Sequence, residues 1–94
     1  MRYSYTRLFV KQVSKIKDKQ LLAALKASIE EIEGAIALGA LPKVKKLAGY
    51  KDYYRLRLQD YRIGIQLVDD TAIIACIYHR KEIYRYFPQH QNWA

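Results

Sequence analysis

The sequence is poor in cysteine, proline and glycine, with one, two and four of these in 94 residues. Because Cys76 is the only cysteine, an intramolecular disulfide and a four-cysteine metal site are both excluded. The low proline content, together with an apolar share of 51%, indicates a folded globule. The sequence also lacks an apolar run that would span a bilayer and the apolar core of a signal peptide. We therefore expect a cytoplasmic protein that does not bind membranes.

Acidic residues are scarce as well. Nine Asp and Glu stand against 17 Lys and Arg, which gives a net charge of +8 and a pI near 9.7. Such an excess favours a polyanionic partner, either nucleic acid, an acidic protein or an anionic membrane surface. A soluble protein can also be basic by chance, so the positions of the charges matter more than their sum.

The first forty residues predict one strand and two helices. Residues 2–5 are short and rich in tyrosine, which is typical of a strand. Thr6 can cap a first helix and Asp18 a second, longer one that ends before Gly39 and Pro42. Apolar residues recur in both helices at the 3.6-residue period of a face packed on a core. They are Phe9, Val13 and Ile16 in the first helix, and Leu21, Leu25, Ile29, Ile32 and Ile36 in the second.

From residue 53 onward the apolar period changes to two, which predicts strands at 53–58, 61–68 and 71–78. The breaks between them are only two residues long, so neighbouring strands must run antiparallel. Residues 81–87 predict a short last helix. With no repeat or linker, residues 1–94 are expected to form a single α+β domain: a short N-terminal strand, two helices, a three-stranded antiparallel meander and a short C-terminal helix.

Arginines gather on one face of the predicted meander. If the chain turns at Gln59-Asp60, Arg57 lies opposite Arg62, and Arg55 lies opposite Gly64 with open space beside it. The helices should cover the leucine face, so the arginines should stand on the open face. Like charges opposite one another destabilise a sheet by up to about 1 kcal/mol. The cluster therefore favours anion binding over a merely solvated surface.

Basic and aromatic residues alternate just before this cluster. Residues 43–62 contain seven basic and two acidic side chains. Because cations follow phosphates and aromatic rings stack on unpaired bases, the mixture suits single-stranded RNA, although tyrosines are also good strand formers. The interleaved tyrosines are Tyr50, Tyr53, Tyr54 and Tyr61.

The last predicted strand leads directly into a second group of polar residues, His79 to Tyr84. On a helical turn Arg80 and Tyr84 would share one face. A guanidinium suits the charge that develops on a phosphate in the transition state, and either the Tyr84 phenol or His79 could move a proton. The alternatives are that Tyr84 is a core aromatic residue and that His79 is structural.

Residues 54–57 (YRLR), 60–63 (DYRI), the Val68-Asp69 break and residues 77–84 (IYHRKEIY) resemble the RelE/ParE superfamily of toxins from type II toxin–antitoxin pairs, and within it the RelE branch. The resemblance implies a RelE-like fold and cleavage of messenger RNA on the ribosome without a metal or other cofactor. In that reaction the ribose 2′-hydroxyl attacks the adjacent phosphate. The catalytic residues implied are Arg62, Arg80 and Tyr84, and the expected RNA-binding residues are Lys43, Lys45, Lys46, Lys51, Arg55, Arg57 and Lys81.

The expected partners are an acidic antitoxin protein that covers the basic face, the ribosome and messenger RNA. Positions 55 and 57 are arginines where the best-known family pattern has lysines. Since arginine keeps its proton, both fit electrostatic roles only. One rival is the ParE branch, which poisons DNA gyrase and is not a nuclease. Another is a non-catalytic RNA-binding module, since fold and charge do not by themselves fix function.

Overall fold

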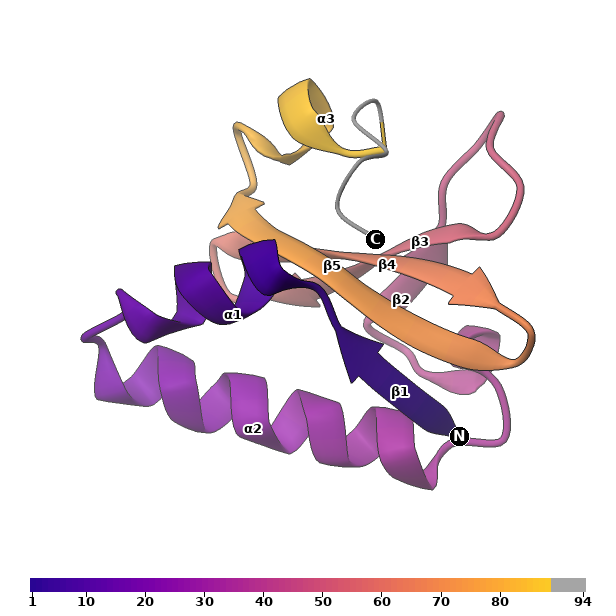
Figure 1. Cartoon of the computed structure of the whole chain (residues 1–94), viewed down its shortest axis with the longest axis horizontal. Coiled ribbons are helices and arrows are strands. Elements are labelled where there is room, and N and C mark those ends of the chain that lie inside the picture. Colours follow the sequence, from indigo (N-terminus) through magenta and orange to yellow (C-terminus); the bar gives the residue numbers. More distant parts are fainter. Residues whose placement is uncertain (89–94) are drawn as a thin grey trace.

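The computed structural model describes residues 1–88. A five-stranded sheet in the order β1-β5-β4-β3-β2 has α2 on one face and the short helix α3 on the other, while α1 packs against β5 (Figure 1). The α+β fold class predicted from the sequence is confirmed. The elements are β1 (Arg2–Tyr5), α1 (Arg7–Ser14), α2 (Lys19–Gly34), the 3-10 turn η1 (Leu38–Ala40), β2 (Val44–Lys46), β3 (Tyr53–Leu58), β4 (Tyr61–Val68), β5 (Thr71–His79) and α3 (Ile83–Tyr86).

Both predicted helix caps are confirmed. The Thr6 hydroxyl accepts a hydrogen bond from the Phe9 N–H (3.0 Å) and donates to the Ala75 carbonyl (2.6 Å), which ties the start of α1 to β5. One Asp18 carboxylate oxygen accepts hydrogen bonds from the N–H groups of Gln20 (2.9 Å) and Leu21 (3.1 Å), the second and third residues of α2. The predicted extension of α2 to Ile36 is wrong, because the backbone becomes extended at Ala35 and leaves Ile36 97% exposed.

The predicted register of the first hairpin is confirmed, with Arg57 opposite Arg62 and Arg55 opposite Gly64. Its turn contains no glycine, and Gln59 instead adopts a positive φ of 55°. In the next turn Asp69 and Asp70 both have positive φ, the pattern that matches the twist of a two-residue hairpin. These polar breaks therefore form tight turns without glycine.

How the two edge strands of the sheet, β1 and β2, pair with their neighbours was not predicted from the sequence. β1 runs parallel to β5, and β2 adds a fifth strand antiparallel to β3. β2 is only three residues long and two of them are lysines, so it has too few residues to show a period of two. Within residues 1–88, no helix is both long enough and apolar enough to cross a membrane.

The sheet has a core on each face. The larger core lies under α1 and α2 and includes Leu56, Leu58, Ile63 and Ile65. The smaller one lies on the other face, where α3 and Phe87 pack on the sheet. A bulge in the pairing of β4 with β5 lets two consecutive residues, Ala75 and Cys76, both contribute to the smaller core. This second core positions α3 beside the arginines.

Candidate functional site

Four cations from three adjacent strands occupy the face of the sheet opposite α1 and α2. Arg57 of β3 pairs directly with Arg62 of β4, and Lys45 of β2 pairs directly with Arg55 of β3. We call Lys45, Arg55, Arg57 and Arg62 the basic face. Two like-charged pairs across neighbouring strands oppose folding, so a bound anion would relieve the repulsion.

Arg62 lies at the centre of these charges. Its guanidinium Nη1 donates hydrogen bonds to the carbonyls of Gln59 (2.9 Å) and Tyr61 (2.8 Å), which holds it against the β3–β4 turn. The pKa of Arg62 is lowered, first by burial and then by the positive charges of Arg55 and Arg57. Arg80 acts in the same direction and Tyr84 in the opposite one, so all of these groups are close enough to interact with Arg62.

Arg80 reaches this neighbourhood from a turn and not from a helix. Its backbone N–H donates to the Asp60 carbonyl (2.7 Å), and its Nε lies 4.0 Å from an Asp60 carboxylate oxygen in an exposed ion pair. The predicted helix over 81–87 is wrong in its bounds, because α3 spans only Ile83–Tyr86. Arg80 and Tyr84 therefore do not share a helical face, and the contact between β5 and the β3–β4 turn positions Arg80 instead.

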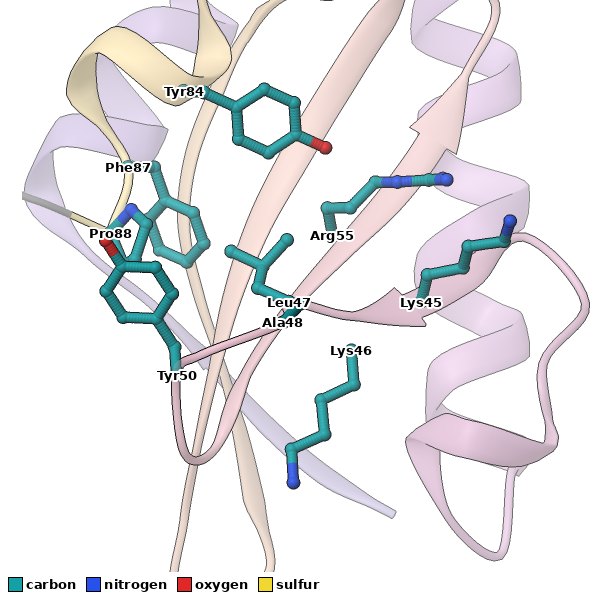
Figure 2. Close-up of a pocket in the computed structure, with 9 residues that line it drawn as sticks. All are labelled: Lys45, Lys46, Leu47, Ala48, Tyr50, Arg55, Tyr84, Phe87 and Pro88. Atoms are coloured by element: carbon teal, nitrogen blue, oxygen red, sulfur yellow. The ribbon is translucent and has the colours of Figure 1, made fainter.

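Tyr84 is not a core aromatic residue. It projects from α3 with 52% of its surface exposed, and its hydroxyl is directed toward Arg55 (Figure 2). The two side chains line the same pocket. A phenol oxygen therefore stands at the Arg55 end of the basic face.

His79 lies on the other side of the sheet. It pairs with Tyr61, and the two rings are in edge contact with centroids 5.7 Å apart. Tyr61 packs on the larger core under the helices, and the His79 Nδ1 accepts a hydrogen bond from the Lys81 N–H (3.2 Å). Because His79 points away from the arginines, it is not positioned to move a proton at the basic face. Within residues 1–88, no group of three or more His, Cys, Asp or Glu is arranged to hold a metal ion.

The lysines predicted to bind RNA do not all lie on the basic face. Lys43 lies beside the basic face, since its carbonyl accepts a hydrogen bond from the Arg57 N–H (3.0 Å). Lys46 pairs with Tyr54, which places it on the opposite face of the sheet from Lys45. Lys51 lies in the loop between β2 and β3, and Lys81 is exposed in the turn before α3.

Three of the four interleaved tyrosines are structural. Tyr53 is buried in the smaller core, and Tyr54 and Tyr61 pack against the larger one. Only Tyr50, in the loop after β2, remains as an exposed ring at 43%. The structure therefore favours the alternative, that the tyrosines are strand formers, at Tyr53, Tyr54 and Tyr61, and leaves Tyr50 as the one of the four that could stack on a base.

The expected open space beside Arg55 is occupied. The ring of Phe87 lies over Gly64, the residue paired with Arg55, and Phe87 is fully buried. Next to it a pocket of about 380 Å³ separates α3 from the loop after β2. Its apolar lining comes from Leu47, Ala48, Phe87 and Pro88. No local pattern indicates these residues, because the pocket forms only when two distant segments meet.

Comparison with known proteins agrees with this geometry. Residues 3–84 match the family described as the ParE toxin of type II toxin–antitoxin systems, parDE. The chain is 38% identical over 89 residues to Toxin RelE3 of Methanocaldococcus jannaschii, a match that covers 94% of this chain and all of that protein.

Solved structures show the same fold. The RelB–RelE antitoxin–toxin complex from Methanococcus jannaschii contains a chain that matches with a TM-score of 0.73 and 35% identity, covering 94% of this chain and all of that one. The YoeB dimer from Staphylococcus aureus matches with a TM-score of 0.67 and 21% identity, covering 84% and 97% of the two chains. Sequence and fold thus agree, and the chain belongs to the ParE toxin family of type II toxin–antitoxin systems, within the RelE/ParE superfamily.

Proposed function

We propose that this toxin is an endoribonuclease that cuts messenger RNA by attack of a ribose 2′-hydroxyl on the adjacent phosphate. The observation that carries the proposal is that the Tyr84 hydroxyl is directed toward Arg55, on a face where Lys45 pairs with Arg55 and Arg57 pairs with Arg62. In the reaction the 2′-oxygen forms a bond to phosphorus and the bond from phosphorus to the 5′-oxygen breaks. The products are a cyclic phosphate and a free 5′-hydroxyl.

Each side chain has a distinct role in this proposal. Arg55 and Arg57 bind and orient the phosphate, while Arg62 and Arg80 stabilise the negative charge that grows on its oxygens in the transition state. Because a guanidinium does not release its proton, these four act through charge alone. Tyr84, in its deprotonated form, takes the proton of the 2′-hydroxyl, and solvent water supplies the proton that the departing 5′-oxygen gains.

The relatives support the RelE side of the superfamily. The protein that is 38% identical is named Toxin RelE3, and the solved structure at 35% identity contains a RelE toxin. The matching family, however, is named for ParE. A gyrase poison without nuclease activity is therefore the second candidate function.

Product analysis tests the proposal. The purified protein is incubated with a messenger RNA, with and without ribosomes, and the new RNA ends are identified. We expect 5′-hydroxyl ends from the wild type and a rate at least about 100-fold lower for Tyr84→Phe, which keeps the ring and removes the hydroxyl. Tyr5→Phe is the matched control, since Tyr5 is similarly exposed at 44% but lies on β1. Equal rates for the wild type and Tyr84→Phe would remove Tyr84 from the chemistry.

The proposed partner is an acidic antitoxin that covers the basic face, while the toxin acts in the cytoplasm on ribosome-bound messages. The support is the self-repelling charge of this face and the RelB–RelE complex among the similar structures. Acetylation of lysines in the complex tests the contact. Lys45 should be protected and Lys26, on α2, should stay reactive. Protection of Lys26 with full reactivity at Lys45 would place the partner on the helices instead.

A further inference from the structure

We propose that the pocket between α3 and the loop after β2 is a subsite for one unpaired nucleobase of the RNA, next to the phosphate held at Arg55. The inference rests on the proposed function, because it adds a second binding position to the same substrate. It assigns a role to Tyr50, which has no part in the chemistry described above.

The pocket has an aromatic wall and an apolar floor. Tyr50 forms the wall at one end, and Phe87 and Pro88 form the buried floor beside it (Figure 2). Tyr50 meets Tyr53 edge to face with centroids 6.1 Å apart, and Tyr53 meets Phe87 in the same way at 5.5 Å. This chain of rings fixes the wall to the smaller core, so Tyr50 presents a face that is already in place for a ligand.

The loop that carries Tyr50 is held at both ends by backbone hydrogen bonds. The Leu47 N–H donates to the Tyr53 carbonyl (2.9 Å), and the Asp52 carbonyl accepts from the Leu67 N–H (2.8 Å). Gly49 and Asp52 adopt positive φ angles of 81° and 66°, which turn the chain tightly. Little conformational entropy would therefore be lost when a ligand binds here.

The chemistry of the rim selects a nucleotide over other flat ligands. Arg55 and Lys45, two members of the basic face that form a direct cross-strand pair, line one side of the pocket. A phosphate bound to these cations would leave its attached base within reach of the Tyr50 ring. The pocket volume of about 380 Å³ lies in the range of small-ligand sites. Stacking on an aromatic ring needs no particular base, so the subsite accepts different nucleobases.

A second apolar pocket lies on the helical side of the sheet, and its lining can be compared with that of the pocket at Tyr50. It is lined by Tyr3, Leu25 and Ile29, and its charged residues are Lys26 and Glu30, one of each sign. It has no pair of cations beside its aromatic wall. The pocket at Tyr50 thus combines an aromatic ring with a cross-strand pair of cations, and the pocket at Tyr3 does not.

The test uses two uncleavable probes of equal charge, a 2′-O-methyl hexauridine and an abasic 2′-O-methyl hexamer with the same phosphates. Binding to the full chain is measured by fluorescence anisotropy at one fixed salt concentration. We expect the wild type to bind the base-bearing probe at least about fivefold more tightly. Tyr50→Leu, which keeps an apolar contact with Tyr53, should lose this preference, and Tyr50→Trp should retain it. Tyr5→Leu is the control and should bind like the wild type.

Equal affinity of the wild type for the two probes would overturn the subsite, and so would an unchanged preference in Tyr50→Leu. The probes lack the attacking 2′-hydroxyl, so the result does not depend on cleavage. A base preference that requires Tyr50, in a protein that cuts no RNA, would support the subsite and contradict the nuclease. Cleavage without any base preference would support the nuclease and contradict the subsite.

Discussion

The ring of Phe87 lies directly over Gly64, so close that a Cβ atom at residue 64 would come within 2.7 Å of the ring atoms Cδ1 and Cγ. Gly64 is in the middle of β4 and pairs with Arg55, while Phe87 follows α3. The absence of a side chain at residue 64 therefore lets the end of α3 sit on the sheet. Because Tyr84 is on the same short helix, this contact also determines where the Tyr84 hydroxyl stands relative to the arginines.

Gly64→Ala should destabilise the protein and impair cleavage together. The added methyl group must displace the Phe87 ring, and overpacking of this kind costs about 1–3 kcal/mol. Gly34→Ala is the control, since a Cβ at residue 34 meets nothing within 4 Å and alanine is favoured in a helix by up to about 1 kcal/mol. Thermal unfolding and the cleavage rate are measured for both. A Gly64→Ala variant as stable and active as the wild type would show that the Phe87 contact is dispensable.

Arg62→Ala should separate chemistry from stability. It removes the repulsion from Arg55 and Arg57, but also two hydrogen bonds to carbonyls, and these opposing effects are each about 1 kcal/mol. The free energy of unfolding should thus change by no more than about 1 kcal/mol, while cleavage falls about 100-fold or more. Arg7→Ala in α1 is the control and should cleave normally. Normal cleavage by Arg62→Ala would mean that the arginines form only a solvated surface with no catalytic role.

Lys45→Ala should lower the salt dependence of RNA binding. Each phosphate contact to a single strand contributes about 0.7 to the slope of log affinity against log salt concentration, and Lys45 stands beside Arg55 on the basic face. Lys26→Ala removes the same charge from α2 and should leave the slope unchanged. The slope is measured by titrating an uncleavable RNA at several salt concentrations. Equal slopes for the two variants would mean that binding responds only to net charge.

Alkaline pH should destabilise the fold through Cys76. Burial in the smaller core raises the pKa of its thiol to about 12, from an ordinary value of 9.0. Between these values the unfolded chain loses a proton that the folded protein retains, so the free energy of unfolding falls as pH rises. The contribution is at most about 1.4 kcal/mol per pH unit. Urea unfolding at pH 8 and pH 10 should show a smaller fall for Cys76→Ala than for the wild type, whereas identical falls would mean that the thiol does not contribute.

Local patterns in the sequence were sufficient for much of the fold and for the arginine pairs. Alternation in β3 and β4 and a two-residue break fix which residues lie opposite each other, so Arg57 could be paired with Arg62 in advance. The caps at Thr6 and Asp18 were similarly local, since a short polar side chain bonds the N–H groups that follow it.

The features that local patterns did not predict depend on contacts between distant segments. The contact of Phe87 with Gly64 joins residues 23 positions apart, and Tyr50 and Pro88 line the same pocket. The face on which His79 lies became clear only from the register of β5 against β4. Geometry of this kind has no periodic signature, so it could not be read from one segment alone.

Cells that express this chain alone show most directly whether the toxin cuts RNA, when both their RNA and their DNA are inspected. We expect growth arrest with messages cut inside their reading frames, new 5′-hydroxyl ends, intact DNA, and loss of these cuts in Tyr84→Phe. Intact messages together with gyrase-dependent DNA breaks would contradict it and establish the second candidate function.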